Sequence, residues 1–351
     1  MSGRAIAAGA ALAALLFSGC AREQTRGVTV LTYASQYSPA HPFSRADIAW
    51  MEWIAARSGG RLRIQPYWSG SVLSSEHSMT EIRHGVVDIG LITPIYARGG
   101  AHLIHVQAAF YAGLTTIPQQ VALYRCLEAA DPQFGRELQG LRVLAVQGGN
   151  LPGIVTRNRA IHTLDDLRGL RLRAPAELLE VLRRFGADPV EMPMGEVYSA
   201  LAKGVLDGVV APADTLRSLH FAEVAHYFYT ISVPRGAYAA RAIGLHRWQS
   251  LTDEERAILE ESVAVWENAL DQQLRRAQVA GEVAGRENQV TFTTPSGADD
   301  RRFLEVYNQV AERNAQLSSR YEIDGLRLFH YARAIVARAG GGAVQCIGEP
   351  E

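Results

Sequence analysis

The sequence predicts an α/β protein made of two blocks, and three observations support this. A chain of 351 residues, 48% of them hydrophobic, is too long for one compact core and too apolar for disorder. Strand-like runs alternate with helical patterns in two separate stretches, which is typical of βαβ units and parallel sheets. Near the end, a helical pattern of roughly 35 residues spans about 50 Å, enough to lie across two domains.

The first block begins with a short β-type run and continues as helix, strand, helix and strand. Apolar residues at helical spacing, closed by Gly59 and Gly60, predict the first helix. In order, the predicted elements are strand 28–33, helix 43–57, strand 62–67, helix 75–84 and the buried strand 86–92.

The second block repeats this alternation and is followed by helices only. The predicted strands are 141–146, 153–156, 170–173, 189–192 and 208–210, and the predicted helices are 176–185 and 195–203, with a further helix start at 163–166. The long helix opens at Thr252 with a capping box completed by Glu255 and continues to about Glu287. Two more helices are predicted at 303–317 and 325–338.

The amino terminus has the pattern of an export signal. After Arg4, an apolar run from Ala5 to Phe17 is too short to cross a membrane but has the length of a secretory signal. The ending Leu16-Phe17-Ser18-Gly19-Cys20 resembles a bacterial lipobox, in which Cys20 would be lipidated, although Phe17 departs from the usual aliphatic residue. Plain cleavage and an uncleaved anchor are the alternatives. Residues 21–27 would form a polar tether, and residues 339–351 a loose tail.

Charge and motifs argue against several classes of protein. The net charge of -1, from 35 basic and 36 acidic residues, lacks the basic surplus of nucleic-acid binding proteins. No nucleophile elbow, phosphate loop or zinc-protease motif occurs. His102 and His105 could share a helical face, but no third metal ligand is evident, so we expect neither metal nor cofactor. Cys126 and Cys346 could pair in an oxidising compartment or stay as two thiols.

Three segments of the second block carry a specific resemblance. They read TLDDLRGLRLRAP from Thr163, FGADPVEMPMGEVYSALAKGVLDGVVAP from Phe185 and HFAEVAHYF from His220. The first block adds SPAHPF from Ser38, SGGRLRIQPYWSG from Ser58 and HGVVDIGLI from His84. From about residue 28 to residue 274 the chain resembles the solute-binding subunit of tripartite ATP-independent periplasmic (TRAP) transporters, of the dicarboxylate type.

The resemblance implies a two-lobed periplasmic binding protein fold with a long helix spanning both lobes. It implies the following organisation: signal peptide 1–20, tether 21–27, first lobe 28–149, second lobe 150–236, return strands with the long and C-terminal helices 237–338, and tail 339–351. The implied role is to capture a small organic acid outside the inner membrane and deliver it to a membrane permease. We expect a monomer that is periplasmic and lipid-anchored to the membrane.

The resemblance assigns the main ligand contact to Arg173. In the family the arginine at this motif position ends a strand and forms a bidentate salt bridge with a ligand carboxylate, for which a planar guanidinium is well suited. Met194 stands where relatives often place an apolar residue against the ligand, although packing in a core gap is an equal alternative.

Departures from the family pattern bear on specificity. Ala211 replaces an asparagine that often contacts the ligand, so Asp214 or another group must supply that hydrogen bond, or it is missing. Sialic-acid binders carry a second arginine about twenty residues before the first, and Gly153 or its neighbours stand there in this chain. Sialic acid is therefore disfavoured, and a less polar monocarboxylate is preferred over a dicarboxylate.

The first lobe offers further candidates for the cleft. An acidic position of the family falls at Ser75 or Glu76, and a Glu76 in the cleft would suit a hydroxyl or ammonium group, whereas on an exposed helix it would do nothing. Aromatic residues with polar tips suit a ligand with an apolar body, and lobe packing is their alternative role. The remaining candidates are Gln36, Tyr37, Trp68, Thr93, Tyr96 and Tyr238, and Tyr33 is a further aromatic residue expected near the lobe interface.

Two other functions compete with the transport role. An exported lipoprotein enzyme could use Glu76 or His77 as a base beside Arg173. A sensor subunit would keep the fold and present its ligand to a receptor. A binding protein needs only a preformed cleft and a hinge, and the lack of a catalytic motif favours it.

Overall fold

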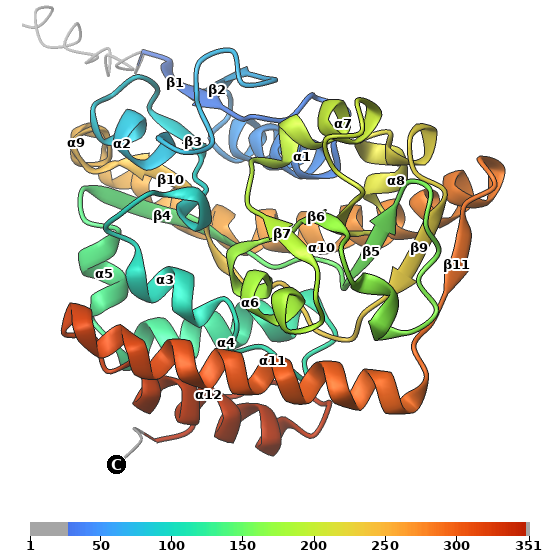
Figure 1. Cartoon of the computed structure of the whole chain (residues 1–351). Coiled ribbons are helices and arrows are strands. Elements are labelled where there is room, and N and C mark those ends of the chain that lie inside the picture. The colour runs from blue at the N-terminus through green and yellow to red at the C-terminus, as the bar shows by residue number, and fades with distance from the viewer. Residues whose placement is uncertain (1–26, 349–351) are drawn as a thin grey trace, which may run out of the picture.

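The computed structural model describes residues 27–348, which form two β-sheets with helices packed around each (Figure 1). Each sheet is the centre of one lobe, so the predicted two-lobed α/β fold is confirmed. The predicted signal segment with Cys20, and residues 21–26 of the tether, lie outside the described residues. No helix within residues 27–348 is long and apolar enough to cross a membrane.

The sheet of the first lobe has the strand order β2-β1-β3-β10-β4. Its strands are β1 (Thr29–Ala34), β2 (Leu62–Tyr67), β3 (Ile89–Leu91), β4 (Leu141–Gln147) and β10 (Tyr238–Gly244). The first three are parallel, and β10 runs antiparallel to both β3 and β4. The strands predicted at the start of the chain are therefore parallel, as expected for βαβ units, but the sheet as a whole is mixed because β10 returns from the second lobe in the reverse direction.

The first lobe contains several helices between residues 94 and 137, where the sequence predicted no elements. All helices of this lobe are α1 (Pro42–Arg57), α2 (Ser78–Arg83), η1 (Pro94–Tyr96), α3 (His102–Gln107), α4 (Ile117–Ala130), α5 (Gln133–Glu137) and α9 (Leu245–Ser250). Helix α1 starts at Pro42, which suits a first helical position, and buries Ala46, Trp50 and Ile54 at four-residue spacing. Helix α4 has a capping box of Thr116 and Gln119 that could have predicted it.

The sheet of the second lobe has the order β11-β9-β5-β8-β6-β7 and is also mixed. Its strands are β5 (Pro152–Thr156), β6 (Arg171–Arg173), β7 (Asp188–Val190), β8 (Gly208–Pro212), β9 (Tyr227–Thr230) and β11 (Thr291–Thr293). Strand β5 is antiparallel to β8 and β9, whereas β6 is parallel to β7 and β8. The helices are η2 (Leu164–Leu167), α6 (Ala176–Arg184), α7 (Met194–Ala202), α8 (Thr215–Ser218) and η3 (Phe221–Glu223).

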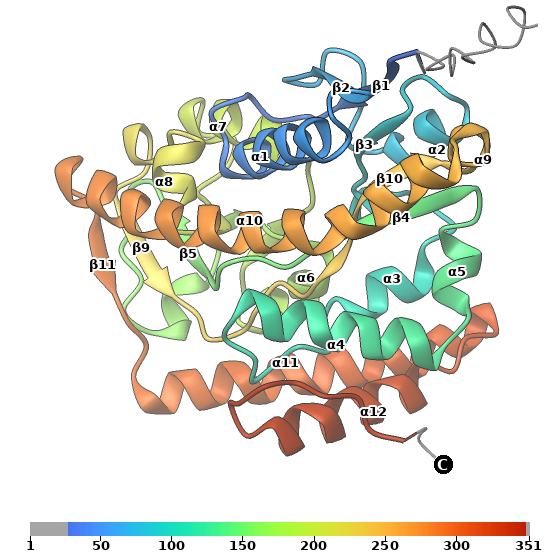
Figure 2. The same cartoon turned by 180° about the vertical axis from the view of Figure 1, so that it is seen from behind.

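The chain crosses between the lobes several times. Residues 148–151 lead from β4 to β5, and residues 231–237 lead from β9 back to β10. The long helix α10 (Asp253–Glu287) packs against α1 and β4 of the first lobe and α8 of the second (Figure 2). Its Gly281 is required by close packing, since a Cβ there would lie 2.1 Å from the carbonyl oxygen of Ala213.

The C-terminal helices α11 (Gly297–Leu317), η4 (Ser318–Tyr321) and α12 (Gly325–Ala339) run beneath both lobes (Figure 1). Helix α11 contacts α6 of the second lobe and α3 of the first, and α12 contacts α4 and α3. These helices therefore add a further bridge between the lobes.

Residues 340–348 are held against the fold, unlike the loose tail expected from the sequence. Cys346 forms a disulfide with Cys126 of α4, so the pairing left open by the sequence is present. Gln119 donates to the carbonyls of Gly341 and Gly342. The segment was hard to recognise because small residues carry no periodic signal and all these contacts are distant in sequence.

Candidate ligand site between the lobes

Arg173 occupies the carboxyl end of β6, where its backbone pairs with Val190 of β7 and Val209 of β8. The side chain is only 2% exposed. Its Nε donates to the carbonyl of Met192 at 2.9 Å, and its Nη2 donates to the hydroxyl of Tyr96 at 2.8 Å. Because Tyr96 belongs to η1 of the first lobe, Arg173 and Tyr96 form a contact across the cleft.

A second arginine–tyrosine pair was not recognised from the sequence. Arg235 lies in the crossing segment 231–237, and its Nη2 donates to the hydroxyl of Tyr238 at 3.0 Å. Gln147 also donates to that hydroxyl, at 2.9 Å. Gly149, in the other crossing segment, leaves room for this arginine, since a Cβ there would lie 2.8 Å from Arg235 Cδ. Because the chain contains many arginines, a single arginine in a loop did not indicate such a contact.

Tyr37 connects the two pairs electrostatically. Burial raises the pKa of its hydroxyl, Tyr96 and Tyr238 raise this pKa further, and Arg235 and Arg173 lower it. The Tyr37 ring stacks on His41 with centroids 4.0 Å apart, which fixes its orientation. Three predicted aromatic residues thus lie together with the two arginines. We call this set the arginine–tyrosine cluster, and its members are Tyr37, Tyr96, Tyr238, Arg173 and Arg235.

Two buried carboxyl groups act on this cluster. Glu177, in the first turn of α6, is 9% exposed, and burial raises its pKa to about 7 although Arg235 and Arg173 oppose the shift. Asp214 is 4% exposed, and burial raises its pKa to about 6 despite a hydrogen bond from Asn150 of 3.0 Å. Asp214, predicted from the sequence, is therefore near the charge of Arg235 and tied to the crossing segment 148–151.

A cavity of about 570 Å³ opens between the lobes next to the cluster. It is lined by Gln36, Tyr37, Ser38, His41 and Ser69 of the first lobe and by Gly195, Tyr198, Ser218, Leu219, His220 and Glu223 of the second. Gln36 Nε2 donates to the carbonyls of Ser74 and Leu91, which leaves Oε1 as a buried acceptor without a partner among residues 27–348. This volume is within the usual range of small-molecule sites.

The remaining first-lobe candidates contact groups of their own lobe. Trp68 packs edge-on against Tyr33 with centroids 5.6 Å apart. Thr93 exchanges hydrogen bonds with Ser78 and donates to Ser75, which fixes the loop before η1. Glu76 pairs with the exposed Arg98 of the same lobe at 2.9 Å. Its proposed contact with a ligand remains untested.

The apolar positions of the second lobe lie together. Ala211 on β8 is 1% exposed and directly opposite Gly153 on β5. A Cβ on Gly153 would meet the Phe228 ring at 2.3 Å, so the ring covers the glycine. Met194 is partly buried against the same hydrophobic cluster, in agreement with a packing role. A larger side chain at Gly153 would therefore not fit this packing.

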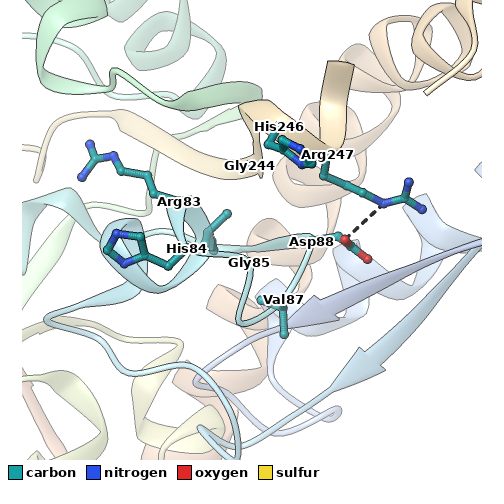
Figure 3. A pocket seen from close by; sticks show the side chains of 9 residues that line it. Arg83, His84, Gly85, Val87, Asp88, Gly244, His246 and Arg247 are labelled. Atoms are coloured by element: carbon teal, nitrogen blue, oxygen red, sulfur yellow. Dashed lines mark ion pairs between the residues drawn. The ribbon is translucent and has the colours of Figure 1, made fainter. Parts of the chain in front are cut away.

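A smaller cavity of about 190 Å³ lies at the edge of the first lobe, lined from α2, the loop before β3, the end of β10 and α9 (Figure 3). Its charged groups serve the fold, since Asp88 pairs with Arg247 at 3.2 Å and accepts from Thr32, while Arg83 donates to two backbone carbonyls. Residues 27–348 contain no group of three potential metal ligands. His102 stacks on Tyr321 and His105 contacts the Pro94 carbonyl.

Two α/β lobes joined by crossing segments, with a cationic cluster and a cavity between them, define the class of two-lobed solute-binding proteins. The chain belongs to the DctP family, bacterial extracellular solute-binding protein family 7, whose model matches residues 33–316. The TRAP solute-binding family suggested by the sequence motifs is thus confirmed.

Individual relatives agree with this assignment. A solute-binding protein of Chromohalobacter salexigens is 21% identical over 304 residues, covering 81% of this chain and 85% of the relative. A TRAP solute binding protein from Rhodoferax ferrireducens, in complex with copurified benzoate, superposes with a TM-score of 0.78 at 22% identity and covers 89% and 98% of the two chains. A Bordetella bronchiseptica TRAP protein with bound mandelate gives 0.77 at 19% identity, covering 88% and 99%. At these identities the structures show a shared fold.

Proposed function

We propose that this protein binds a small organic acid between its lobes in the periplasm and delivers it to a TRAP membrane permease. The observation that carries the proposal is the buried guanidinium of Arg173, which has no salt-bridge partner among residues 27–348. A buried charge is stabilised by pairing, and a carboxylate supplies two parallel charge-assisted hydrogen bonds. The hydrogen bond to Tyr96 adds a contact from the opposite lobe.

We propose a monocarboxylate with an apolar or aromatic body as the ligand class. Three tyrosines provide large rings with polar tips beside Arg173, and Ala211, which replaces the asparagine of the family pattern, supplies no polar contact from the second lobe. The benzoate and mandelate bound by similar structures support the choice of aromatic acids as first ligands to test.

The first experiment is a thermal-shift screen against organic acids, because a ligand that binds only the folded state raises the melting temperature. Arg173→Ala should then raise the dissociation constant of the best acid by at least about tenfold, through loss of a charge-assisted pair. The control is Arg57→Ala, since Arg57 is exposed and pairs with Glu261 on the surface. Unchanged affinity in Arg173→Ala, or shifts only from neutral or cationic compounds, would contradict the proposal.

The proposal includes no catalytic step. The enzymatic alternative required Glu76 or His77 as a base beside Arg173, but Glu76 pairs with Arg98 whereas Arg173 contacts Met192 and Tyr96. Genetic evidence distinguishes the transport role from the sensor alternative. A transport role predicts permease genes adjacent to the gene of this protein, and deletion of the gene of this protein should abolish uptake of the identified acid.

We further propose that Cys20 carries a lipid anchor and that the mature protein is a monomer. Cys20→Ser should move the protein from the membrane fraction to the soluble periplasm. Retention of this variant in the membrane would instead point to an uncleaved signal segment. Sedimentation of the purified protein tests the monomer.

A further inference from the structure

We propose that Arg235 and Tyr238 form a second arm of the site, so that one ligand carboxylate is held between Arg173–Tyr96 and Arg235–Tyr238. This inference rests on the proposed function and extends it from one cation to two. It assigns the ligand's carboxylate to the arginine–tyrosine cluster and the ligand's body to the adjoining cavity of about 570 Å³.

The hydrogen-bond directions support a shared anion. Tyr96 and Tyr238 each accept from a guanidinium, at 2.8 Å and 3.0 Å, and Tyr238 also accepts from Gln147. Because a phenol has one proton of its own, each hydroxyl can still donate to an acceptor. The two hydroxyls and the unused N–H groups of the two arginines therefore form a set of donors that a carboxylate would satisfy.

Arg241 shows how this fold treats an arginine with a structural role. Its side chain is fully buried, and it donates from Nε and Nη2 to both oxygens of Asp47, at 2.7 Å and 3.1 Å. By contrast, neither Arg173 nor Arg235 makes a salt bridge within the described residues. Of the three arginines, only Arg173 and Arg235 therefore lack an anionic partner within the described residues.

The charged and titratable groups that face Arg235 come from both lobes. Tyr96 and Tyr37 lie on the first lobe, Tyr238 begins β10, and the buried Glu177 belongs to the second lobe. Asp214 and His41 also feel the charge of Arg235. Since these carboxyl groups are beyond salt-bridge distance, a ligand carboxylate at the cluster would become the closest anion.

The position of Arg235 links the ligand to lobe movement. Arg235 lies in one crossing segment and packs against Gly149 of the other. Such segments absorb the rotation when two lobes close. A carboxylate bound to Arg235 would therefore contact the hinge directly, and binding would favour the conformation in which both arms meet it.

The test compares benzoate with neutral benzamide by calorimetry, in the full mature chain. Arg235→Gln should weaken benzoate binding by about tenfold or more and reduce the preference for benzoate over benzamide. Arg235→Lys should recover part of that preference, because it restores the charge without the planar donor set. Arg83→Gln is the control, since Arg83 is also partly buried and donates to two backbone carbonyls at the separate small cavity of the first lobe.

Tyr238→Phe and Tyr96→Phe serve as milder variants in case Arg235→Gln fails to fold. Each removes one hydroxyl, and we expect comparable losses of benzoate affinity of about fivefold from the two. If benzoate and the other carboxylates do not bind the wild-type chain, the proposed function fails together with this inference. If they bind, Arg173→Gln weakens them and both Arg235→Gln and Tyr238→Phe do not, this inference alone is overturned.

Discussion

At the scale of single residues, two buried arginines have different roles because they have different partners. Arg241 and Arg173 are both buried, yet Arg241 meets Asp47 whereas Arg173 meets only neutral oxygens. Tyr33 and Trp266 complete the shell of Asp47 with further hydrogen bonds. The charge of the first arginine is therefore already paired inside the first lobe, where loss of either partner would leave a buried charge unpaired, and the second remains available for an anion.

The pKa of Glu177 leads to a prediction about stability. Burial raises this pKa to about 7, from 4.5 in an exposed glutamate. A raised pKa in the folded state means that stability is fully present below pH 4.5 and is lost as pH rises through about 7. Glu177→Gln removes the buried ionisation and should stabilise the protein at about pH 8 by about 1–3 kcal/mol.

Urea unfolding of the wild type and Glu177→Gln across pH measures this difference. The gap between the two proteins should narrow as pH falls toward 4.5. Glu180→Gln is a suitable control, because Glu180 lies on the same helix but its side chain is 43% exposed. A gap that is independent of pH would show that the glutamine acts through packing and not through the ionisation.

At the scale of elements, the long helix α10 is held by side-chain hydrogen bonds in one part and by close backbone packing in another. Ser262 and Trp266 face α1 and bond with Trp50 and Asp47. Gly281 instead lets the helix backbone approach the loop before α8. The helical pattern and capping box predicted this element closely, but the requirement for a glycine at that turn follows only from the approach of another segment.

Gly281→Ala tests that approach. The added Cβ would lie 2.1 Å from a backbone oxygen, which cannot move as a flexible side chain can. We expect a loss of unfolding free energy of about 1–3 kcal/mol, although alanine is the better helix former. Val279→Ala, on the same helix with 63% exposure, should change little. Equal effects of the two substitutions in denaturant titrations would contradict the close-contact explanation.

At the scale of the whole molecule, contacts distant in sequence join the ends of the chain to the lobes. The disulfide links α4 to the C-terminal segment across 220 residues, and α11 and α12 pass beneath both lobes. Such a link restricts the unfolded chain strongly, so its contribution to stability is expected to be substantial.

Replacing both cysteines by serine should therefore lower stability by about 2–4 kcal/mol. Differential scanning calorimetry of Cys126→Ser/Cys346→Ser measures the loss, and proteolysis should release the last residues earlier. The matched experiment is mild reduction of the wild-type protein, in which labelling of both thiols shows that the disulfide has been broken. A fully reduced protein with unchanged melting temperature would show that the hydrogen bonds of Gln119 and Tyr331 hold the segment without the disulfide.

Prediction from sequence succeeded where the signal is local. Strand β2 and helix α1 follow from periodicity, and Arg173 follows from its motif. The pair of Arg235 and Tyr238 spans only three residues, but it was not predicted, because the residues of the crossing segment do not indicate that they lie beside Arg173 and Tyr96. The helix α4 is a different case, since its capping box was present and unused.

The sequence by itself determined the alternation of strands and helices, the two lobes, the long helix and the family motif around Arg173. These depend on periodicity and short-range chemistry, which neighbouring residues carry. The tertiary structure alone decided the antiparallel position of β10, the partner of each cysteine and the convergence of two arginines on three tyrosines. Those features depend on which surfaces meet and exclude water, and this is fixed only when segments distant in the chain pack together.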